Sequence, residues 1–310
     1  MTGPALLALA AAVLCSSAAT GDIEVGRSPA VPAVYVFGDS LVDAGNNDFL
    51  PPPAPRAVPP NGVDLPRWVL HRTGRFTNGF NLADIIAQHV GFKMSPPAYL
   101  SLTPLSSLEL LRGRVGANYA SGGSGILDIT GNGTLTLREQ ELYRLGARKL
   151  AVLDILPVGC LPSQRAITAN GACDADGNTL SEMFNAVLRV EVAKAVAASM
   201  PGLRYSIAGV YNVLSDMIAN PALAGLREVE TGCCGGGKFN GEVDCAAGAS
   251  LCTDRDEYLF WDKVHGTEAA YRRAVHAFFN GRTRDAEPIN LAQLVGAPSS
   301  TAPAAAYASI

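Results

Sequence analysis

Residues 34–40 read VYVFGDS, a short apolar run of β-forming residues that ends in glycine, aspartate and serine. Such a run predicts a buried strand. Similar runs predict strands over 115–120, 149–156 and 204–210, and apolar residues at helical spacing predict helices over 81–90, 135–145, 179–200, 213–219 and 267–279. Alternating strands and helices predict an α/β fold with a parallel sheet, whose ligands bind beyond the carboxyl ends of the strands.

Composition favours one globular domain. The chain has 310 residues, of which 48% are hydrophobic and 17% charged, and its formal net charge is −4. No long run of lysine and arginine is present, so neither nucleic acid nor an anionic membrane surface is expected as a partner. We assign the domain to residues 31–296 and expect the Ala/Ser/Pro-rich residues 297–310 to be a disordered tail.

The first twenty residues predict a secretory signal peptide. The apolar run over 5–14 is too short to span a bilayer, and Ser17-Ala18-Ala19 fits the small-x-small cleavage rule. A buried helix of the mature fold is the competing interpretation. No other stretch is long enough for stable membrane insertion, and Asn132 begins a glycosylation sequon that secretion would make usable.

Seven cysteines are present, and one of them, Cys15, falls in the signal segment. The other six are Cys160, Cys173, Cys233, Cys234, Cys245 and Cys252. An even number behind a signal peptide predicts disulfides, and a bond between the first two would close a short loop. Sequence alone does not choose the pairing. Zinc binding by the last four is the alternative, although paired Cys-x-x-Cys spacing and a nearby histidine pair are missing.

Ser40 is the candidate nucleophile, because it follows a buried strand and is expected to open a helix. Its own N–H and the helix N-terminus could then stabilise an oxyanion. The alternative is that Ser40 merely caps that helix. The Gly-x-Ser-x-Gly elbow of α/β-hydrolases is absent.

A serine nucleophile needs a base, and the chain offers four histidines, His71, His89, His265 and His276. His265 stands out because Asp262, three residues earlier, can turn back to accept a hydrogen bond from its Nδ1–H. A capping aspartate beside a surface histidine is the alternative.

Several segments, in order along the chain, resemble the plant GDSL esterase/lipase family of the SGNH hydrolase superfamily. They are VFGDSLVD at 36–43, TGRFTNG at 73–79, GANYASGG at 116–123, LGARK at 145–149, LPVGC at 156–160, CCG at 233–235 and YLFWDKVH at 258–265. The resemblance covers most of the chain.

The resemblance implies a flavodoxin-like three-layer αβα sandwich with a parallel sheet. It implies that Ser40 is the nucleophile of a Ser-His-Asp triad completed by His265 and Asp262. The N–H groups of Ser40 and Gly122 would form the oxyanion hole, with Gly123 as the neighbouring possibility. The implied protein is a secreted esterase or lipase of the cell wall or apoplast that acts on lipid or acetylated carbohydrate esters. It needs no metal or cofactor, and we expect a monomer.

The sequence departs from the family in two places. The third family block, a Gly-x-Asn-Asp segment, should precede LGARK but is not there, so one strand–helix unit and one oxyanion donor are expected to be missing. Gly45-Asn46-Asn47-Asp48 matches that block by letters but belongs to the first block. The proline that usually follows the catalytic histidine is Gly266, which would loosen the start of the last helix.

Two other functions stay open. The missing block favours a catalytically impaired or inactive family member that binds lipid or carbohydrate. A disulfide-held structural wall protein would account for the cysteines but leaves Asp262 and His265 without a role.

Overall fold

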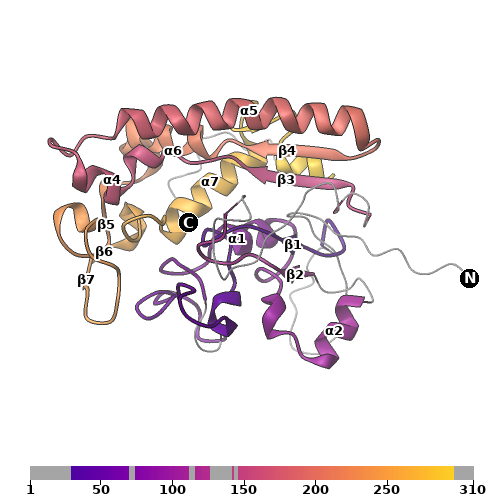
Figure 1. Cartoon of the computed structure of the whole chain (residues 1–310), viewed down its shortest axis with the longest axis horizontal. Coiled ribbons are helices and arrows are strands. Elements are labelled where there is room, and N and C mark those ends of the chain that lie inside the picture. Colours follow the sequence, from indigo (N-terminus) through magenta and orange to yellow (C-terminus); the bar gives the residue numbers. More distant parts are fainter. Residues whose placement is uncertain (1–28, 70–73, 112–115, 126–141, 143–145, 297–310) are drawn as a thin grey trace, which may run out of the picture.

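The computed structural model describes residues 29–69, 74–111, 116–125, 142 and 146–296 (Figure 1). The predicted signal peptide, the sequon at Asn132, His71, the tail over 297–310 and most of the helix predicted over 135–145 lie outside these residues.

The described strands are short and the helices are of uneven length. The helices are α1 (Leu82–His89), α2 (Pro104–Leu111), α4 (Pro162–Ile167), α5 (Ala175–Ser199), α6 (Val210–Ala219), α7 (Glu268–Asn280) and α8 (Leu291–Val295). The strands are β1 (Tyr35–Val36), β2 (Ala117–Asn118), β3 (Lys149–Leu153), β4 (Arg204–Ala208), β5 (Glu228–Gly232), β6 (Cys234–Gly235), β7 (Ser250–Leu251), β8 (Tyr258–Phe260) and β9 (Ala286–Glu287).

The strands form separate ladders. β1 pairs in parallel with β2, β3 with β4, and β5 with β8, whereas β9 adds to β4 in the antiparallel direction. The register of the longest pair runs from Lys149 opposite Arg204 to Leu153 opposite Ala208. The pair β6–β7 is also antiparallel, and among the described residues no ladder joins β1 to β3, so the parallel pairs are separate ladders.

Helices cover both faces of β3 and β4, which gives the three-layer α/β arrangement. Because side chains alternate along a strand, Leu150 and Val152 face one side, where they cluster with Ala195 and Val196 of α5. Ala151 faces the other side and joins the main core with α7 and α8. Figure 1 shows α5 along the outer edge of the molecule, with β3 and β4 between it and α7.

Two helices begin earlier in the sequence than the spacing of apolar residues indicated. α5 begins at Ala175 rather than at residue 179, because the side chain of Asp174 accepts hydrogen bonds from the N–H groups of Asp176 and Gly177. α6 begins at Val210, directly after β4 and Gly209, where the sequence had predicted that the strand would end.

The six cysteines of the domain are all paired in disulfides. Cys160 bonds to Cys173, which closes the short loop noted in the sequence, and the other two bonds are Cys233–Cys252 and Cys234–Cys245. The alternative of a zinc site in this cluster is therefore wrong, because no thiolate remains to bind the metal. None of the described helices combines the length and the hydropathy of a bilayer span.

Candidate active site

Ser40 lies in a tight turn just beyond the carboxyl end of β1. The sequence predicted that it would open a helix, but residues 40–42 form a turn, and the next helical segment is a 3-10 helix over Asn46–Phe49. The side chain of Asp39 accepts a hydrogen bond from the N–H of Leu41 at 2.9 Å. Such local side-chain bonds compete with helix formation, so the helix N-terminus expected at Ser40 is absent.

Ser40 and His265 meet although they come from opposite ends of the domain. The Oγ of Ser40 lies 2.8 Å from Nε2 of His265. On the other side of the ring, Nδ1 of His265 lies 2.8 Å from Oδ2 and 3.0 Å from Oδ1 of Asp262. With Nδ1–H donating to the carboxylate, Nε2 is left to accept from the serine hydroxyl.

Asp262 is fixed by the backbone of its own loop. Its Oδ1 also accepts hydrogen bonds from the N–H groups of Val264 and His265, both at 2.8 Å. Asp262 and His265 are buried, with 9% and 7% of their surface exposed, whereas Ser40 is only partly covered. His265 and Asp262 are therefore shielded from solvent, whereas the hydroxyl of Ser40 stays within reach of it.

The two charges change each other's proton affinity. Burial alone would raise the pKa of Asp262, but the charge of His265 and the N–H donors bring it below its ordinary value. Burial alone would lower the pKa of His265, but the carboxylate of Asp262 raises it above its ordinary value. The pair thus favours the imidazolium that forms when a serine gives up its proton.

Phe76 and Tyr271 contact the loop that carries His265, and no sequence motif predicted a role for either. The ring of Phe76 stacks on the imidazole of His265, with 5.4 Å between centroids. The hydroxyl of buried Tyr271 accepts a hydrogen bond from the N–H of Gly266 at 2.9 Å, and Thr77 Oγ1 donates to the Gly266 carbonyl at 2.8 Å. A proline at 266 would have no N–H to give, so glycine here tightens the loop that the sequence predicted to be loose.

Asp43 connects the serine turn to the glycine turn that follows β2. Its Oδ1 accepts from the N–H groups of Gly45 and Asn46, and its Oδ2 accepts from the N–H of Gly122 at 2.9 Å. Asn47 adds a second link, since its Nδ2 donates to the Gly122 carbonyl at 2.7 Å. Through these bonds Asp43 and Asn47 order the loop around Ser40.

The same bonds change the choice of oxyanion donors. The N–H of Gly122, the expected second donor, is already engaged by a buried carboxylate and is not free for a ligand. No described residue accepts a hydrogen bond from the N–H of Ser40 or of Gly123. Gly123 has a φ of +83°, a left-handed conformation that glycine adopts without strain.

The asparagines near Ser40 are occupied by the backbone. Asn46 Nδ2 donates to the carbonyls of Asn118 and Ala120, and Asn47 Nδ2 donates to those of Pro55 and Gly122. Neither amide can donate to an oxyanion without breaking these bonds.

The other described histidines lie away from Ser40. His89 Nδ1 contacts the Ile85 carbonyl at 2.9 Å, and its ring stacks on Phe279. His276 lies within α7. The described residues contain no group of three or more His, Cys, Asp or Glu placed to hold a metal ion.

Comparison with known proteins gives one consistent result. Residues 34–141 match the model of the family described as GDSL-like Lipase/Acylhydrolase. The chain is similar to three Arabidopsis thaliana proteins: GDSL esterase/lipase At5g55050 (33% identity, 87% of this chain and 91% of the relative), At4g16230 (32%, 85% and 91%) and GDSL esterase/lipase 7 (30%, 86% and 93%).

The relatives also carry residues with no counterpart here. The alignment with At5g55050 spans 347 positions but uses 87% of the 310 residues of this chain, about 270, so about 77 positions belong to the relative alone. Identity at this level over almost the full length of the relatives establishes the kinship, and the chain belongs to the GDSL esterase/lipase family.

Proposed function

We propose that this protein is a serine esterase or lipase that hydrolyses carboxylic esters by acyl transfer at Ser40. The observation that carries the proposal is the chain of contacts from Ser40 Oγ through the imidazole of His265 to the carboxylate of Asp262. Membership of the GDSL family supports ester hydrolysis in general, and the contacts support Ser40, His265 and Asp262 as the residues that perform it.

In the proposed reaction, His265 Nε2 takes the proton of Ser40 as Oγ attacks the ester carbonyl. The tetrahedral intermediate collapses when the imidazolium returns that proton to the leaving alcohol. Water, activated by the same nitrogen, then releases the acid and restores the serine. Asp262 stays ionised throughout and orients the ring.

The oxyanion hole that we propose uses the N–H groups of Ser40 and Gly123. Gly123 replaces the expected Gly122 because the latter donates to Asp43. One oxyanion donor contributes about 10²–10³ in rate, so a site without the third family donor is expected to be slower by about that factor.

We also propose where the protein acts and on which esters. The protein is secreted behind the signal peptide over residues 1–20 and acts on lipid or acetylated carbohydrate esters outside the cell, in the cell wall or apoplast. Three disulfides in a chain of this size support an oxidising compartment.

Hydrolysis of p-nitrophenyl acetate and butyrate, together with labelling by a fluorophosphonate, tests the proposal. We expect the purified protein to hydrolyse both esters and to be labelled at Ser40, and Ser40→Ala to abolish both signals. Ser199→Ala is the matched control, because this exposed hydroxyl donates only to a carbonyl within α5. Hydrolysis that survives Ser40→Ala would refute the assignment.

An inactive binding protein is the second candidate, favoured by the missing third donor. Folded protein that takes no label at Ser40, but retains lipid or oligosaccharide in an equilibrium binding measurement, would support it over the enzyme.

A further inference from the structure

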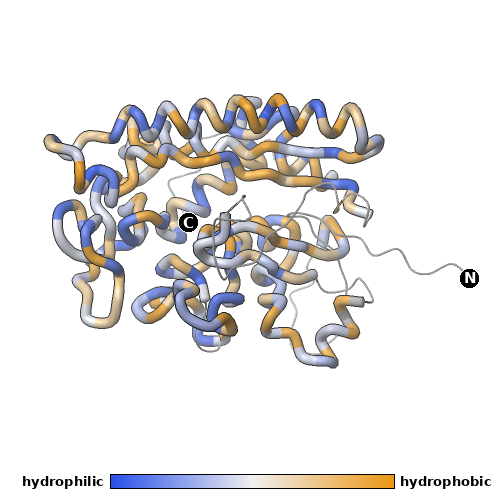
Figure 2. The backbone as a smooth tube through the Cα atoms, in the orientation of Figure 1, coloured by the Kyte–Doolittle hydropathy of each residue, from blue (hydrophilic) through white to orange (hydrophobic). Residues whose placement is uncertain are grey.

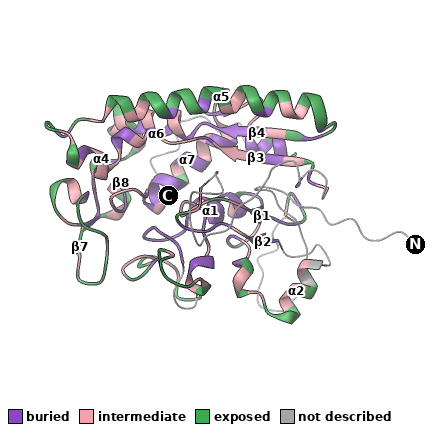
Figure 3. Cartoon of the chain, viewed as in Figure 1, coloured by how far each residue is buried: buried purple, intermediate pink, exposed green. Residues whose placement is uncertain are grey.

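Helix α5 exposes a row of large apolar side chains on the side that faces away from β3. The row, which we call the outer stripe, consists of Leu180, Met183, Val187 and Val190, whose exposed fractions are 66%, 61%, 61% and 50%. Figure 3 shows the outward side of α5 coloured as exposed along much of its length, and Figure 2 shows hydrophobic residues recurring along the same helix.

The spacing of the outer stripe is that of a helix–helix seam. Steps of three, four and three residues give two heptads, the repeat with which one helix packs along another. The opposite side of α5 is already in use, since Ser181, Asn185 and Val192 are buried against the domain. The outer stripe is therefore a second apolar surface on a helix whose opposite face is already packed against the domain.

The stripe ends in charges of opposite sign. Asp176 lies four residues before Leu180, and Lys194 lies four residues after Val190. Because these steps again follow the helical repeat, both charges lie in line with the stripe, and both residues are exposed. Lys194 also contacts Glu191 at 2.8 Å, but such an exposed pair is weak and leaves Lys194 able to exchange partners.

This arrangement is complementary to itself. If a second α5 lies antiparallel about a two-fold axis at the level of residue 185, Leu180 faces Val190, and Met183 faces Val187. The same axis places Asp176 of each copy opposite Lys194 of the other. All three pairings follow from one axis, which is the relation that an isologous dimer requires.

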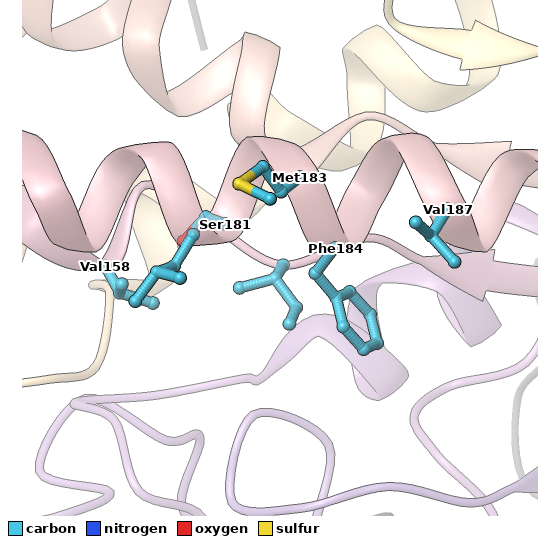
Figure 4. Close-up of a pocket in the computed structure, with 7 residues that line it drawn as sticks. Val158, Ser181, Met183, Phe184 and Val187 are labelled. Atoms are coloured by element: carbon cyan, nitrogen blue, oxygen red, sulfur yellow. The ribbon is translucent and has the colours of Figure 1, made fainter.

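An open apolar groove lies beside the stripe and enlarges the surface. Its volume is about 560 Å³, and Ile155, Val158 and Phe184 line it together with members of the stripe. In Figure 4, Met183, Phe184 and Val187 project from α5, and Val158 lies beside the same helix. The segment from Asp176 to Lys194 is about 27 Å of helix, so the stripe and the groove together offer an extended contact surface for a second copy.

Contiguous exposed apolar surface on a soluble protein marks an interaction site or an aggregation risk.

We propose that the outer stripe of α5 is a homodimer interface, in which two copies of this chain pair antiparallel across a two-fold axis. The proposal replaces the monomer expected from the sequence. It does not depend on Ser40 being catalytic.

Light scattering after size exclusion, with sedimentation equilibrium, tests the interface on the secreted full-length protein over roughly 1–100 µM, where moderate interfaces associate. We expect twice the mass of one chain at the upper concentrations. Val187→Glu should weaken dimerisation at least tenfold, because it places two carboxylates in the seam. Ala193→Glu, an exposed change on the same helix away from the stripe, should leave the mass unchanged.

A charge exchange tests the antiparallel geometry. Asp176→Lys and Lys194→Asp should each weaken the dimer by placing like charges opposite each other, whereas the double variant should restore it. Circular dichroism shows whether each variant keeps its helices. The proposal is overturned by a monomer at every concentration, by a dimer that Val187→Glu leaves intact, by a double variant no better than the singles, or by a monomer that instead binds phosphatidylcholine vesicles through Val187.

Discussion

Asp43→Asn removes the carboxylate that ties the serine turn to the glycine turn. The carboxylate accepts three backbone N–H groups, two from its own turn and one from Gly122. An amide can keep its oxygen toward the two nearer donors, but its NH₂ then faces the N–H of Gly122, and that bond is lost. A bond to a charged acceptor contributes about 1.5–3 kcal/mol, and the unmet buried N–H adds to the loss.

The cost of burying the charge of Asp43 reduces the expected loss of stability. Burial raises the pKa of Asp43 despite its N–H partners, which means that the charge itself is costly to bury. The neutral amide recovers part of that cost, so we expect a net loss of about 2–3 kcal/mol in the free energy of unfolding. Because Gly122 carries Gly123 with it, a shift of about 1 Å in the turn should also lower kcat about 100-fold.

Urea unfolding followed by fluorescence, and kcat on p-nitrophenyl butyrate, measure the two effects. Glu191→Gln is the matched control, since it removes only an exposed ion pair on α5 and should cost less than about 0.5 kcal/mol. If Asp43→Asn behaves like this control in both measurements, Asp43 does not hold the two turns together.

Two further predictions concern the same site, and a third concerns the buried ion pair between Arg75 and Asp84 of α1. His265 must be neutral to accept a proton, so activity should fall as the pH drops through its pKa. The midpoint should lie above the ordinary histidine value because the carboxylate of Asp262 raises that pKa, and Asp262→Asn should move the midpoint of any residual activity downward. Phe76→Leu should lower kcat by roughly 10- to 100-fold with a smaller change in KM, because the imidazole loses its stacking partner, and unchanged kcat would count against that role. Arg75→Met should cost about 3–5 kcal/mol in urea unfolding by leaving the buried carboxylate of Asp84 without its 2.7 Å partner, and a loss under about 1 kcal/mol would contradict this.

The sequence predicted what depends on local pattern. The apolar runs at 34–37 and 149–156 contain the shorter strands β1 and β3, and the long amphipathic stretch after residue 179 is a helix, because apolar pattern specifies the type of an element better than its ends. Ser40, Asp262 and His265 were identified from short motifs, and the fold brings them together.

Contacts between distant segments could not be predicted in the same way. Cys233 and Cys234 are adjacent, so the sequence does not indicate which of them bonds to Cys245 and which to Cys252. Only the fold distinguishes the two pairings. The contact of Asp43 with Gly122 joins residues 79 positions apart, and no spacing rule relates them. Phe76 lay in a segment noted for its resemblance to the family, but its stacking on His265 depends on where the last loop returns.

The paired cysteines have a consequence for how the protein can be produced. The N–H of Cys234 donates to the carbonyl of Trp261 at 2.7 Å, and the N–H of Cys233 donates to the carbonyl of Phe260. The disulfides of these two cysteines therefore lie next to the loop that bears Asp262. In a reducing cytosol the disulfides of Cys233 and Cys234 would not form. We expect the turn that bears Ser40 to be intact there, whereas the loop that bears His265 would lack the support of these disulfides. We therefore expect hydrolysis at Ser40 to depend on these two disulfides, and recombinant material should be judged by its oxidation state before its turnover is compared with that of relatives.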